Sequence, residues 1–184
     1  MVRHGESTWN ELGLVQGQDD TSRLTEHGRL QARALAIELD HEDFDAVLSS
    51  DLTRAFETAT ILTEARGVPI VTSRLLRERC FGVAETRPLG ALTPELTGIR
   101  DGRVIDENAR PEGGESLRDF SDRVERFVEE AIAVYAGARL LVVAHGGTIR
   151  TLNALLSQRS IVDVPWDGVE NCSRWEFDVS LPEA

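Results

Sequence analysis

The sequence opens with Met1-Val2-Arg3-His4-Gly5-Glu6-Ser7-Thr8-Trp9-Asn10, and its Arg-His-Gly triplet is an unusual way for a chain to leave a strand. Arginine carries a fixed charge and a planar fork of donors that suits phosphate oxygens. Histidine is the side chain most easily kept neutral and nucleophilic near pH 7. Glycine lets the backbone turn sharply and come close to a ligand. The triplet therefore indicates a phosphate site with a nucleophile in it, and the rest of the chain must decide.

The charge balance limits the partners that the chain can have. Its 184 residues suit one domain, and 41% hydrophobic with 28% charged residues is normal for a soluble globular protein. Lys and Arg number 20 against 32 Asp and Glu, so the net charge is -12. Nucleic acid and anionic membranes both require a basic face, and we expect neither as a partner. A small phosphorylated metabolite remains compatible if the few basic residues converge in one pocket.

Cysteine usage and hydropathy indicate the compartment. Cys80 and Cys172 form neither a disulfide framework nor a metal-ligand pattern, which is typical of a reducing cytoplasm. No apolar run approaches the length of a membrane span. Charged and polar residues begin at Arg3, where a signal peptide would continue into an apolar stretch. We expect a cytoplasmic protein with one domain over residues 1–184, since no repeat or linker divides the chain.

Two predicted strands end in residues suited to phosphate. Residues 44–50 predict a strand that ends in two serines, and Asp51 is the predicted cap of the helix that follows. Arg54 lies in the first turn of that helix, where a cation is unfavourable unless an anion sits in front of it. A solvated surface arginine is an equally good interpretation of its position. Residues 139–144 form an apolar run typical of a central strand buried on both faces, and it ends in His145-Gly146-Gly147.

The remaining pattern alternates strands with helices. Thr25 is the predicted cap of a helix whose apolar stripe holds Leu30, Ala34 and Ile37, with Leu35 as a further candidate. Further elements are a loop from Glu6 to Asp20, a short strand at 68–71, a long helix after Ser116, and a last, edge-type strand at 175–179. This order predicts an α/β fold of three layers, with a central, mostly parallel sheet and helices on both faces. Ligands gather at the carboxyl ends of strands in such sheets.

One irregular segment interrupts this pattern at about residues 83–112. It is rich in Pro and Gly and too long for a simple connection, and such segments are often lids. Four scattered arginines in it could shape an anionic substrate, or the segment could simply be solvated: Arg87, Arg100, Arg103 and Arg110. Just before it, Glu78 lies in a partly apolar stretch. An apolar pocket can raise the pKa of a carboxyl toward that of a general acid, although most glutamates are solvated.

Several separately spaced motifs resemble one family. The strand-end motifs are Arg3-His4-Gly5, Ser49-Ser50-Asp51-Leu52-Thr53-Arg54-Ala55 and Ala144-His145-Gly146-Gly147. Further matches are Asn10, residues 24–32, residues 54–59, Leu76-Arg77-Glu78 and Gly113-Gly114-Glu115-Ser116. Together they resemble the phosphoglycerate-mutase-like branch of the histidine phosphatase superfamily. The resemblance runs from residue 1 to about the end of the chain.

The resemblance implies a role for each matching residue. His4 corresponds to the nucleophile that takes the phosphoryl group, and Glu78 to the proton donor for the leaving group, which then activates water. His4 would attack as neutral imidazole, its other nitrogen held by a neighbouring carbonyl. The implied phosphate clamp is Arg3, Arg54 and a protonated His145, and the implied pocket lining adds Asn10, Gln16, Gly17 and Gly146. We expect no metal and no cofactor, because these cations would do the work of a metal.

Departures from the family favour a phosphatase within this branch. The cofactor-dependent mutases are usually longer, with a tyrosine just after the general acid and an arginine pair in an inserted segment. Here Glu78 is followed by Arg79-Cys80-Phe81-Gly82, and the segment 83–112 has no Arg-Arg pair. The long segment favours a small-molecule monoester as substrate. A cofactor-dependent phosphoglycerate mutase and a non-catalytic phosphate-binding module remain as alternatives, and a homodimer is possible.

Overall fold

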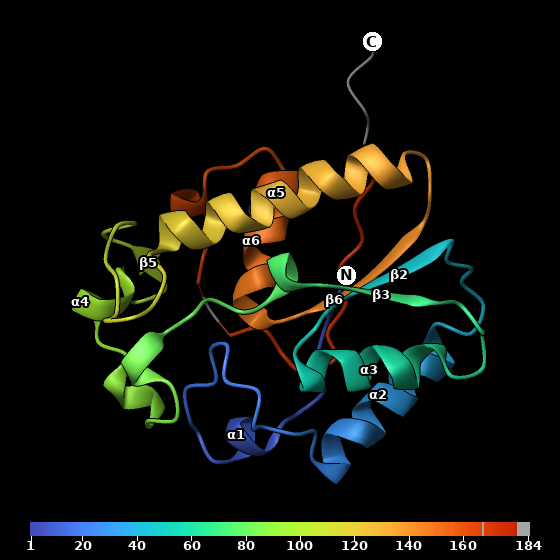
Figure 1. Cartoon of the computed structure of the whole chain (residues 1–184), viewed down its shortest axis with the longest axis horizontal. Coiled ribbons are helices and arrows are strands. Elements are labelled where there is room, and N and C mark those ends of the chain that lie inside the picture. The colour runs from blue at the N-terminus through green and yellow to red at the C-terminus, as the bar shows by residue number, and fades with distance from the viewer. Residues whose placement is uncertain (167, 180–184) are drawn as a thin grey trace.

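The computed structural model describes residues 1–166 and 168–179 and has a parallel sheet between two helical layers (Figure 1). The four strands run in the order β1-β6-β2-β3. Their bounds are Val2–Arg3 for β1, Ala46–Ser50 for β2, Ile70–Ser73 for β3 and Leu140–Ala144 for β6. The predicted three-layer α/β fold with a central parallel sheet is therefore confirmed.

The register of the parallel strands brings three chain segments to one edge. Arg3 pairs with Ala144 between β1 and β6, and Ser49 pairs with Val143 between β2 and β6. The residues that directly follow these strands therefore leave the sheet side by side. His4 follows β1, and His145 follows β6. The register thus places the two predicted site histidines next to each other.

Helices cover both faces of the sheet. The longer ones are α2 (Glu26–Glu38), α3 (Thr53–Thr63), α5 (Leu117–Tyr135) and α6 (Gly146–Leu156). One apolar core lies between the sheet and α2 with α3, and a second lies between the sheet and α5 with α6 (Figure 1). Val47 belongs to the first core, and Val142 on the adjacent strand belongs to the second. Val142 pairs with Leu48, the residue after Val47, and successive side chains of a strand point to opposite faces. Two separate cores hold the sheet rigid between them.

The start of α3 differs from the sequence prediction. Its N-cap is Leu52, which provides no side-chain cap, and Asp51 does not serve as one. The carboxylate of Asp51 instead accepts two hydrogen bonds from Arg77, at 2.7 and 2.6 Å. Burial raises the pKa of Asp51, but the hydrogen bonds and charge of Arg77 outweigh burial and leave it below its usual value. A bidentate ion pair to a neighbouring loop has therefore displaced a helix cap.

The buried face of α2 also differs from the prediction. Leu30 and Ile37 are 54% and 76% exposed, so most of the predicted stripe faces solvent. Of the predicted residues only Leu35 is buried, and the buried side of the helix also holds Gly28, Ala32 and the capping residue Leu39. Close backbone packing explains this choice, because a Cβ on Gly28 would lie 2.0 Å from the carbonyl oxygen of Glu6. Likewise a Cβ on Gly5 would lie 2.5 Å from the carbonyl oxygen of Gly28, so Gly5 is needed for packing against α2.

Two predicted loops contain short ordered elements. The loop from Glu6 to Asp20 includes α1 (Thr8–Glu11), which begins with a capping box between Ser7 and Asn10. The segment 83–112 is built from one-turn helices and a hairpin. Its elements are η2 (Gly82–Ala84), η3 (Leu89–Ala91), α4 (Pro94–Thr97), β4 (Ile99–Arg100) and β5 (Arg103–Val104). Two further one-turn helices lie outside the segment, η1 (Arg74–Leu76) before it and η4 (Ile161–Asp163) after α6.

A single buried arginine fastens the segment 83–112 to the domain. Arg79 is 2% exposed, and its guanidinium donates to the carbonyl oxygens of Glu115, Thr97 and Ala109 at 2.9, 2.7 and 3.0 Å. The two last carbonyls belong to the segment itself. Burial lowers the pKa of Arg79 to about 10, which still leaves it charged at neutral pH. The role of this segment as a lid stays a prediction.

The predicted last strand at 175–179 is absent from the described residues. Only Arg174 forms a bridge, antiparallel to Val2, and Trp175 exchanges backbone hydrogen bonds with Met1 at 2.6 and 2.9 Å. The predicted strand at 175–179 is therefore wrong, because alternation alone does not make a strand and a strand also needs a partner for its backbone groups.

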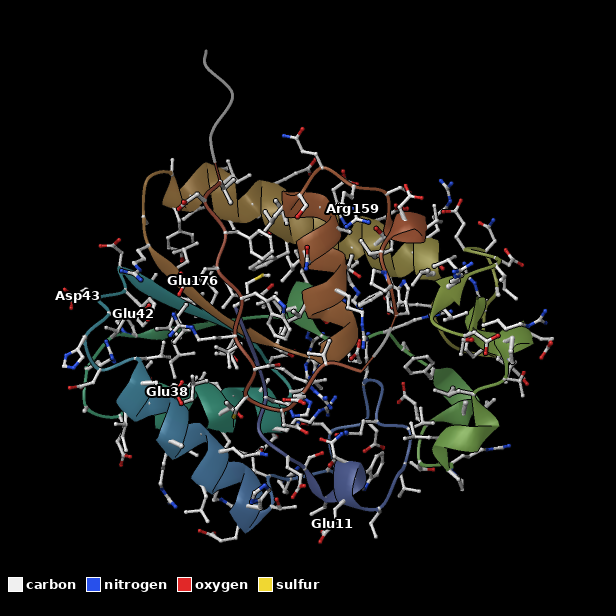
Figure 2. All side chains as sticks on the ribbon, turned by 180° about the vertical axis from the view of Figure 1, so that it is seen from behind. Glu11, Glu38, Glu42, Asp43, Arg159 and Glu176 are labelled. Carbon is white, nitrogen blue, oxygen red and sulfur yellow. The ribbon has the colours of Figure 1, made fainter. Side chains whose placement is uncertain are left out.

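Charge is divided between the surface and the interior. The labelled acidic side chains Glu11, Glu38 and Asp43 lie at the periphery in Figure 2 and are exposed. Among the described residues, the fully buried charged side chains with the least exposure are Arg54 and Arg79. The acidic surface therefore surrounds a basic interior. Within residues 1–166 and 168–179, no helix is long and apolar enough to cross a membrane.

The contact between α2 and the turn after His4 makes a prediction about stability. Gly28→Ala would place a methyl group against the Glu6 backbone, and we expect a loss of about 2 kcal/mol or more, despite the better helix propensity of alanine. Urea denaturation followed by circular dichroism measures this loss. Gly90→Ala is the matched control, because nothing lies within 4 Å of its Cβ position. Equal stability of the two variants would contradict this account of α2 packing.

Candidate active site

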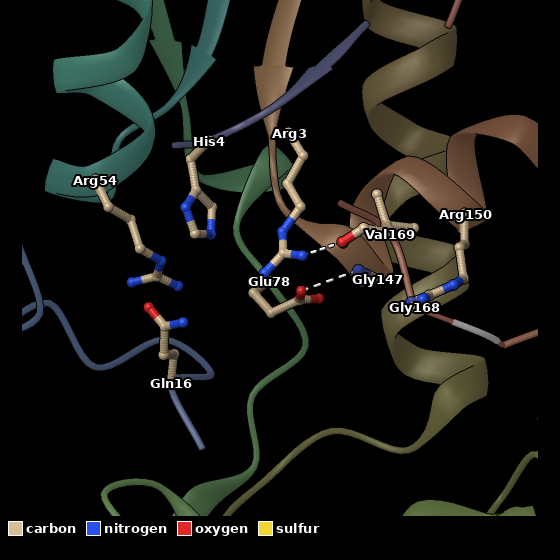
Figure 3. Close-up of a pocket in the computed structure, with 10 residues that line it drawn as sticks. Arg3, His4, Gln16, Arg54, Glu78, Gly147, Arg150, Gly168 and Val169 are labelled. Atoms are coloured by element: carbon tan, nitrogen blue, oxygen red, sulfur yellow. Dashed lines mark hydrogen bonds between the residues drawn. The ribbon is translucent and has the colours of Figure 1, made fainter. Parts of the chain in front are cut away.

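A cavity of about 230 Å³ opens at the edge where β1, β2 and β6 end. This volume lies below the ~300–1,000 Å³ of pockets for drug-sized ligands, so it suits a small ligand. Three of its lining residues are arginines and one is a glutamate. The lining, most of it labelled in Figure 3, is Arg3, His4, Gln16, Arg54, Glu78, Gly146, Gly147, Arg150, Gly168 and Val169. A chain of net charge -12 thus concentrates cations at one place.

His4 is buried, neutral and held in one tautomer. Its ring Nδ1 lies 2.7 Å from the carbonyl oxygen of Gly5, which can only accept, so Nδ1 carries the proton and Nε2 keeps its lone pair. Burial lowers the pKa of His4 well below its usual value, and the charges of Arg54 and Arg3 lower it further. Its backbone is fixed as well, by Ala144 on one side and Asn171 on the other. The expected carbonyl partner is therefore present, and Nε2 is available for attack.

His145 packs directly against His4. The ring centroids are 5.2 Å apart with an interplanar angle of 62°. Nε2 of His145 lies 2.8 Å from Oγ of Ser50, which also accepts from the backbone N–H of Leu52 at 3.3 Å. The Ser50 hydroxyl can donate to a bare Nε2 or accept from a protonated one, so this contact holds the ring in place in either tautomer. Ser50 ends β2, so the strand-end serine orients the second histidine.

His145 is expected from the sequence to be protonated, but the site without a ligand favours its neutral form. Burial lowers the pKa of His145 well below its usual value, and the charges of Arg54, His4 and Arg3 act in the same direction. The three neighbouring groups of positive or potentially positive charge disfavour a further positive charge. His145 is therefore neutral before a ligand arrives.

Arg3 and Arg54 are held by backbone carbonyls. Arg54 is 1% exposed and donates to the carbonyl oxygens of Gly17 and Asp19 at 2.8 and 3.1 Å. Arg3 donates to the carbonyl oxygen of Val169. Burial lowers the pKa of Arg54 to about 10 and also lowers that of Arg3, so both remain charged at neutral pH. The carbonyls orient the guanidinium groups and leave their full charge in the cavity.

Three buried polar atoms at this edge have no partner within the described residues: Nε of Arg3, Nε of Arg54 and Nδ1 of His145. Buried polar groups are hydrogen-bonded in more than about 90% of cases, so three unpaired ones in one place need an explanation. The two arginine Nε groups are donors, and Nδ1 of His145 is a donor when it carries the ring proton. An oxyanion with several acceptor oxygens would satisfy them together, as expected for a phosphate site.

Glu78 enters the cavity from the loop after η1. Its Oε2 accepts the N–H of Gly147, at the start of α6, and its Oε1 accepts the N–H of Arg79, both at 2.9 Å. The expected apolar surroundings are not what the structure has, because Arg3 and Arg54 share the cavity with this carboxyl. Two backbone donors fix the carboxyl facing the pocket, next to the arginines (Figure 3).

The other predicted lining residues divide into two groups. Gln16 and Gly146 line the cavity as expected. Asn10 and Gly17 are not among the lining residues. The side chain of Asn10 caps α1 and accepts from Asn171 at 3.3 Å, and Gly17 supplies the carbonyl that holds Arg54. Asn10 and Gly17 therefore hold other site residues in place from outside the cavity.

Sequence reasoning missed four lining residues: Gly147, Arg150, Gly168 and Val169. Arg150 follows Gly146 by four positions, so helical periodicity could have placed it on the side of α6 that faces the ligand end. Gly168 and Val169 gave no comparable signal, because they reach the site only through tertiary packing. The same is true of Asn171, which binds the backbone of His4.

The four arginines of the segment 83–112 do not line the cavity. All four are exposed. Arg100 forms an ion pair with Glu95 at 3.6 Å, and Arg110 forms one with Asp119 at 2.5 Å. Their alternative interpretation as a solvated surface therefore fits the structure, and the cations of the site come from the sheet edge and from α3 and α6.

Burial of the two site histidines makes a prediction about pH. Because their folded-state pKa lies below the unfolded value of about 6.5, the unfolded state binds protons first as the pH falls. Stability is therefore retained above about pH 7 and lost below about pH 6.5, by up to about 1.4 kcal/mol per pH unit for each histidine. We expect His145→Gln to weaken this slope between pH 6.5 and 5 by that amount, in urea titrations free of phosphate and sulfate. His27→Gln, at an exposed position, is the control, and equal slopes in both variants would contradict the assignment.

Comparisons with known proteins agree with this geometry. The family model for the histidine phosphatase superfamily (branch 1) matches residues 1–180. A protein of Yersinia pestis (strain Pestoides F) named probable phosphoglycerate mutase GpmB is 39% identical over 158 residues, which is 85% of this chain and 72% of that protein.

Solved structures show the same fold. A mycobacterial glucosyl-3-phosphoglycerate phosphatase, determined with VO3, superposes with a TM-score of 0.80 at 32% identity, covering 97% of this chain and 96% of the other. The alpha-ribazole phosphatase of Shigella flexneri gives a TM-score of 0.77 at 34% identity, covering 87% and 79%. With an Arg-His-Gly turn, a second buried histidine and three arginines around one cavity, this chain belongs to the histidine phosphatase superfamily, branch 1.

Proposed function

We propose that the protein is a phosphatase that hydrolyses a small-molecule phosphate monoester through a phosphohistidine on His4. The observation that carries this proposal is the unprotonated Nε2 of a buried, neutral His4 in a cavity with Arg3, Arg54 and Arg150. A nucleophile that stays deprotonated among cations is suited to attack an anionic ester. The small cavity supports a small metabolite as the substrate.

In the first step Nε2 of His4 attacks phosphorus, an N–P bond forms, and the bond from phosphorus to the ester oxygen breaks. Glu78 gives its proton to the departing oxygen, since a dianionic ester bound beside it favours the neutral form of a carboxyl. The unpaired donors of Arg3, Arg54 and His145 would bind the phosphoryl oxygens. Positioning and charge, with no resident metal, would lower the barrier in this scheme.

In the second step a water molecule attacks the phosphohistidine. The Glu78 carboxylate takes a proton from this water, the N–P bond breaks, and inorganic phosphate leaves with His4 restored to its neutral form. Glu78 thus acts as acid and then as base. Its fixed position between the N–H groups of Gly147 and Arg79 suits both steps, because the carboxyl need not move between them.

Hydrolysis is favoured over the mutase reaction by the placement of cations. A mutase has to protect its phosphohistidine from water and retain a bisphosphate intermediate, which requires many cations around a second anionic group. The four arginines of the segment 83–112 are exposed and lie outside the cavity lining. The similar proteins include both phosphatases and a probable mutase, so this choice rests on the cavity.

Product analysis tests the reaction class. We expect incubation with 3-phosphoglycerate, or with a panel of phosphorylated metabolites, to release inorganic phosphate, and addition of 2,3-bisphosphoglycerate not to divert it to 2-phosphoglycerate. Activity should persist in a chelator and disappear in His4→Ala, which lacks the attacking atom. Rapid interconversion of phosphoglycerates with little free phosphate would establish the mutase instead, and activity dependent on an added divalent metal would refute the metal-free scheme.

Leaving-group dependence tests Glu78. General acid catalysis is typically worth about 10²–10⁴-fold, and a good leaving group needs little of it. We expect Glu78→Gln to slow an alkyl phosphate such as glycerol 3-phosphate by about that factor and p-nitrophenyl phosphate far less, in initial-rate measurements. Glu85→Gln, in the neighbouring segment, serves as a matched control. Equal losses on both substrates would show that Glu78 does not protonate the leaving group.

A further inference from the structure

The segment that carries Glu78 into the cavity has no regular secondary structure of its own. Residues 77–81 lie outside the helices and strands, so the hydrogen bonds of a helix or a sheet do not fix their backbone. The proton transfers proposed for Glu78 depend on where its carboxyl lies, since a misplacement of about 1 Å can cost about 10²-fold in rate. Contacts from side chains must therefore hold this segment in place.

Arg123, on α5, binds the segment from one side. Its Nη1 donates to the carbonyl oxygens of Leu75 and Arg77 at 2.8 and 2.9 Å, and its Nη2 donates to that of Glu78 at 3.1 Å. The guanidinium carbon lies 5.0 Å from the ring centroid of Phe120, which is buried in the core between α5 and the sheet. A single side chain thus connects the rigid core to three carbonyls at and before Glu78.

Glu115, just before α5, binds the segment from the other side. Its carboxylate accepts from Nε and Nη2 of Arg123 at 2.7 and 2.8 Å, and from the backbone N–H of Cys80 at 2.9 Å. All five N–H donors of Arg123 are then used, three on carbonyls and two on this carboxylate. The side chains of Arg123 and Glu115 are 11% and 20% exposed, so water competes little with these contacts.

The Glu115–Arg123 pair is separate from the groups proposed to bind the phosphoryl oxygens. Among the described residues that line the cavity, neither member of the pair occurs. Arg3 ends β1, Arg54 lies at the start of α3, and His145 directly follows β6. Loss of the pair should therefore displace the carboxyl of the general acid and leave the nucleophile and the phosphate ligands where they are.

We propose that Glu115 and Arg123 are positioning residues for the general acid, which fix Glu78 for proton transfer and take no part in the attack by His4. The proposal rests on the proposed function, in which Glu78 acts as acid and then as base. Arginine is required at position 123, because its planar fork has five donors, whereas lysine has three on one nitrogen. A lysine there could not bind three carbonyls and a carboxylate at once.

Leaving-group dependence separates positioning from general damage to the fold. The value of kcat/KM, which reports the steps up to departure of the leaving group, is measured for Arg123→Met with two esters. We expect it to fall by about 10- to 100-fold for glycerol 3-phosphate, which needs the acid, and by less than about threefold for p-nitrophenyl phosphate, which needs little of it. Glu115→Ala should give the same pattern, because it frees both the guanidinium and the Cys80 N–H.

Two further variants control for charge and folding. Arg123→Lys keeps the charge, which is one of the smaller causes that lower the pKa of His145, after burial as the main cause. Its kcat/KM for glycerol 3-phosphate should lie between those of the wild type and Arg123→Met, and it replaces Arg123→Met if circular dichroism shows that variant to be unfolded. Arg118→Met removes an exposed arginine of α5 that pairs with Glu107 at 2.6 Å, and it should leave both esters unaffected.

A double-mutant cycle tests whether the pair acts through Glu78. In the Glu78→Gln background the acid is already absent, so adding Arg123→Met should slow glycerol 3-phosphate by less than about threefold more. Equal losses on the two esters in Arg123→Met, no loss on either, or an undiminished loss in the Glu78→Gln background would each overturn the proposal.

Failure of the proposed function would be seen separately. If the wild type hydrolyses neither ester, or Glu78→Gln slows both equally, that function fails, and the positioning of Glu78 is then measured by hydrogen–deuterium exchange. Three backbone N–H groups report on it, because the carboxylates of Glu78 and Glu115 accept them: Arg79, Cys80 and Gly147. Exchange there that is about tenfold faster in Arg123→Met but not in Arg118→Met would sustain the positioning role, and unchanged exchange would refute it.

Discussion

The constraint on which this structure depends is the burial of Arg3 and Arg54, which within the described residues are held by carbonyls and lie near Glu78 without forming an ion pair with it. Arg3 and Arg54 are removed from water next to two imidazoles, and this arrangement lowers the pKa of all four groups. Carbonyl dipoles of Val169, Gly17 and Asp19 compensate the two arginines only in part. The fold has to stabilise this unfavourable centre, and an anionic ligand would relieve it.

Elsewhere the protein uses arginine in the opposite way. Arg77 pairs with Asp51, and Arg123 pairs with Glu115 at 2.7 Å, so each of these charges is cancelled locally. Such pairs join loops and helices into one scaffold. The site arginines are instead held by neutral acceptors, which orient them as firmly but leave their charge for a ligand. A carbonyl partner alone does not make an arginine ligand-binding, because three carbonyls hold Arg79 in a structural role; Arg3 and Arg54 differ in that they also line the cavity.

Much of the fold and site was predictable from the sequence because strand ends are local signals. The apolar run at 139–144 and the Arg-His-Gly triplet each indicate the end of a strand from local sequence alone. A parallel sheet then brings the carboxyl ends of neighbouring strands together. The carbonyl partners of the arginines, Val169 among them, were not predictable, since they meet the site only through tertiary packing. The exposed stripe of Leu30 and Ile37 shows the same limit. Two faces of α2 were apolar, and a backbone contact between Gly28 and Glu6 decided between them.

Residues 168–175 pack beside the first strand, with a consequence for how the site forms. Arg3 binds the carbonyl of Val169 and the His4 carbonyl binds Asn171, across separations of 166 and 167 positions. In the unfolded chain His4 is therefore an ordinary, solvated imidazole that can be protonated. Its buried, neutral form arises only when these distant residues dock, and folding dominated by such contacts is expected to be slow.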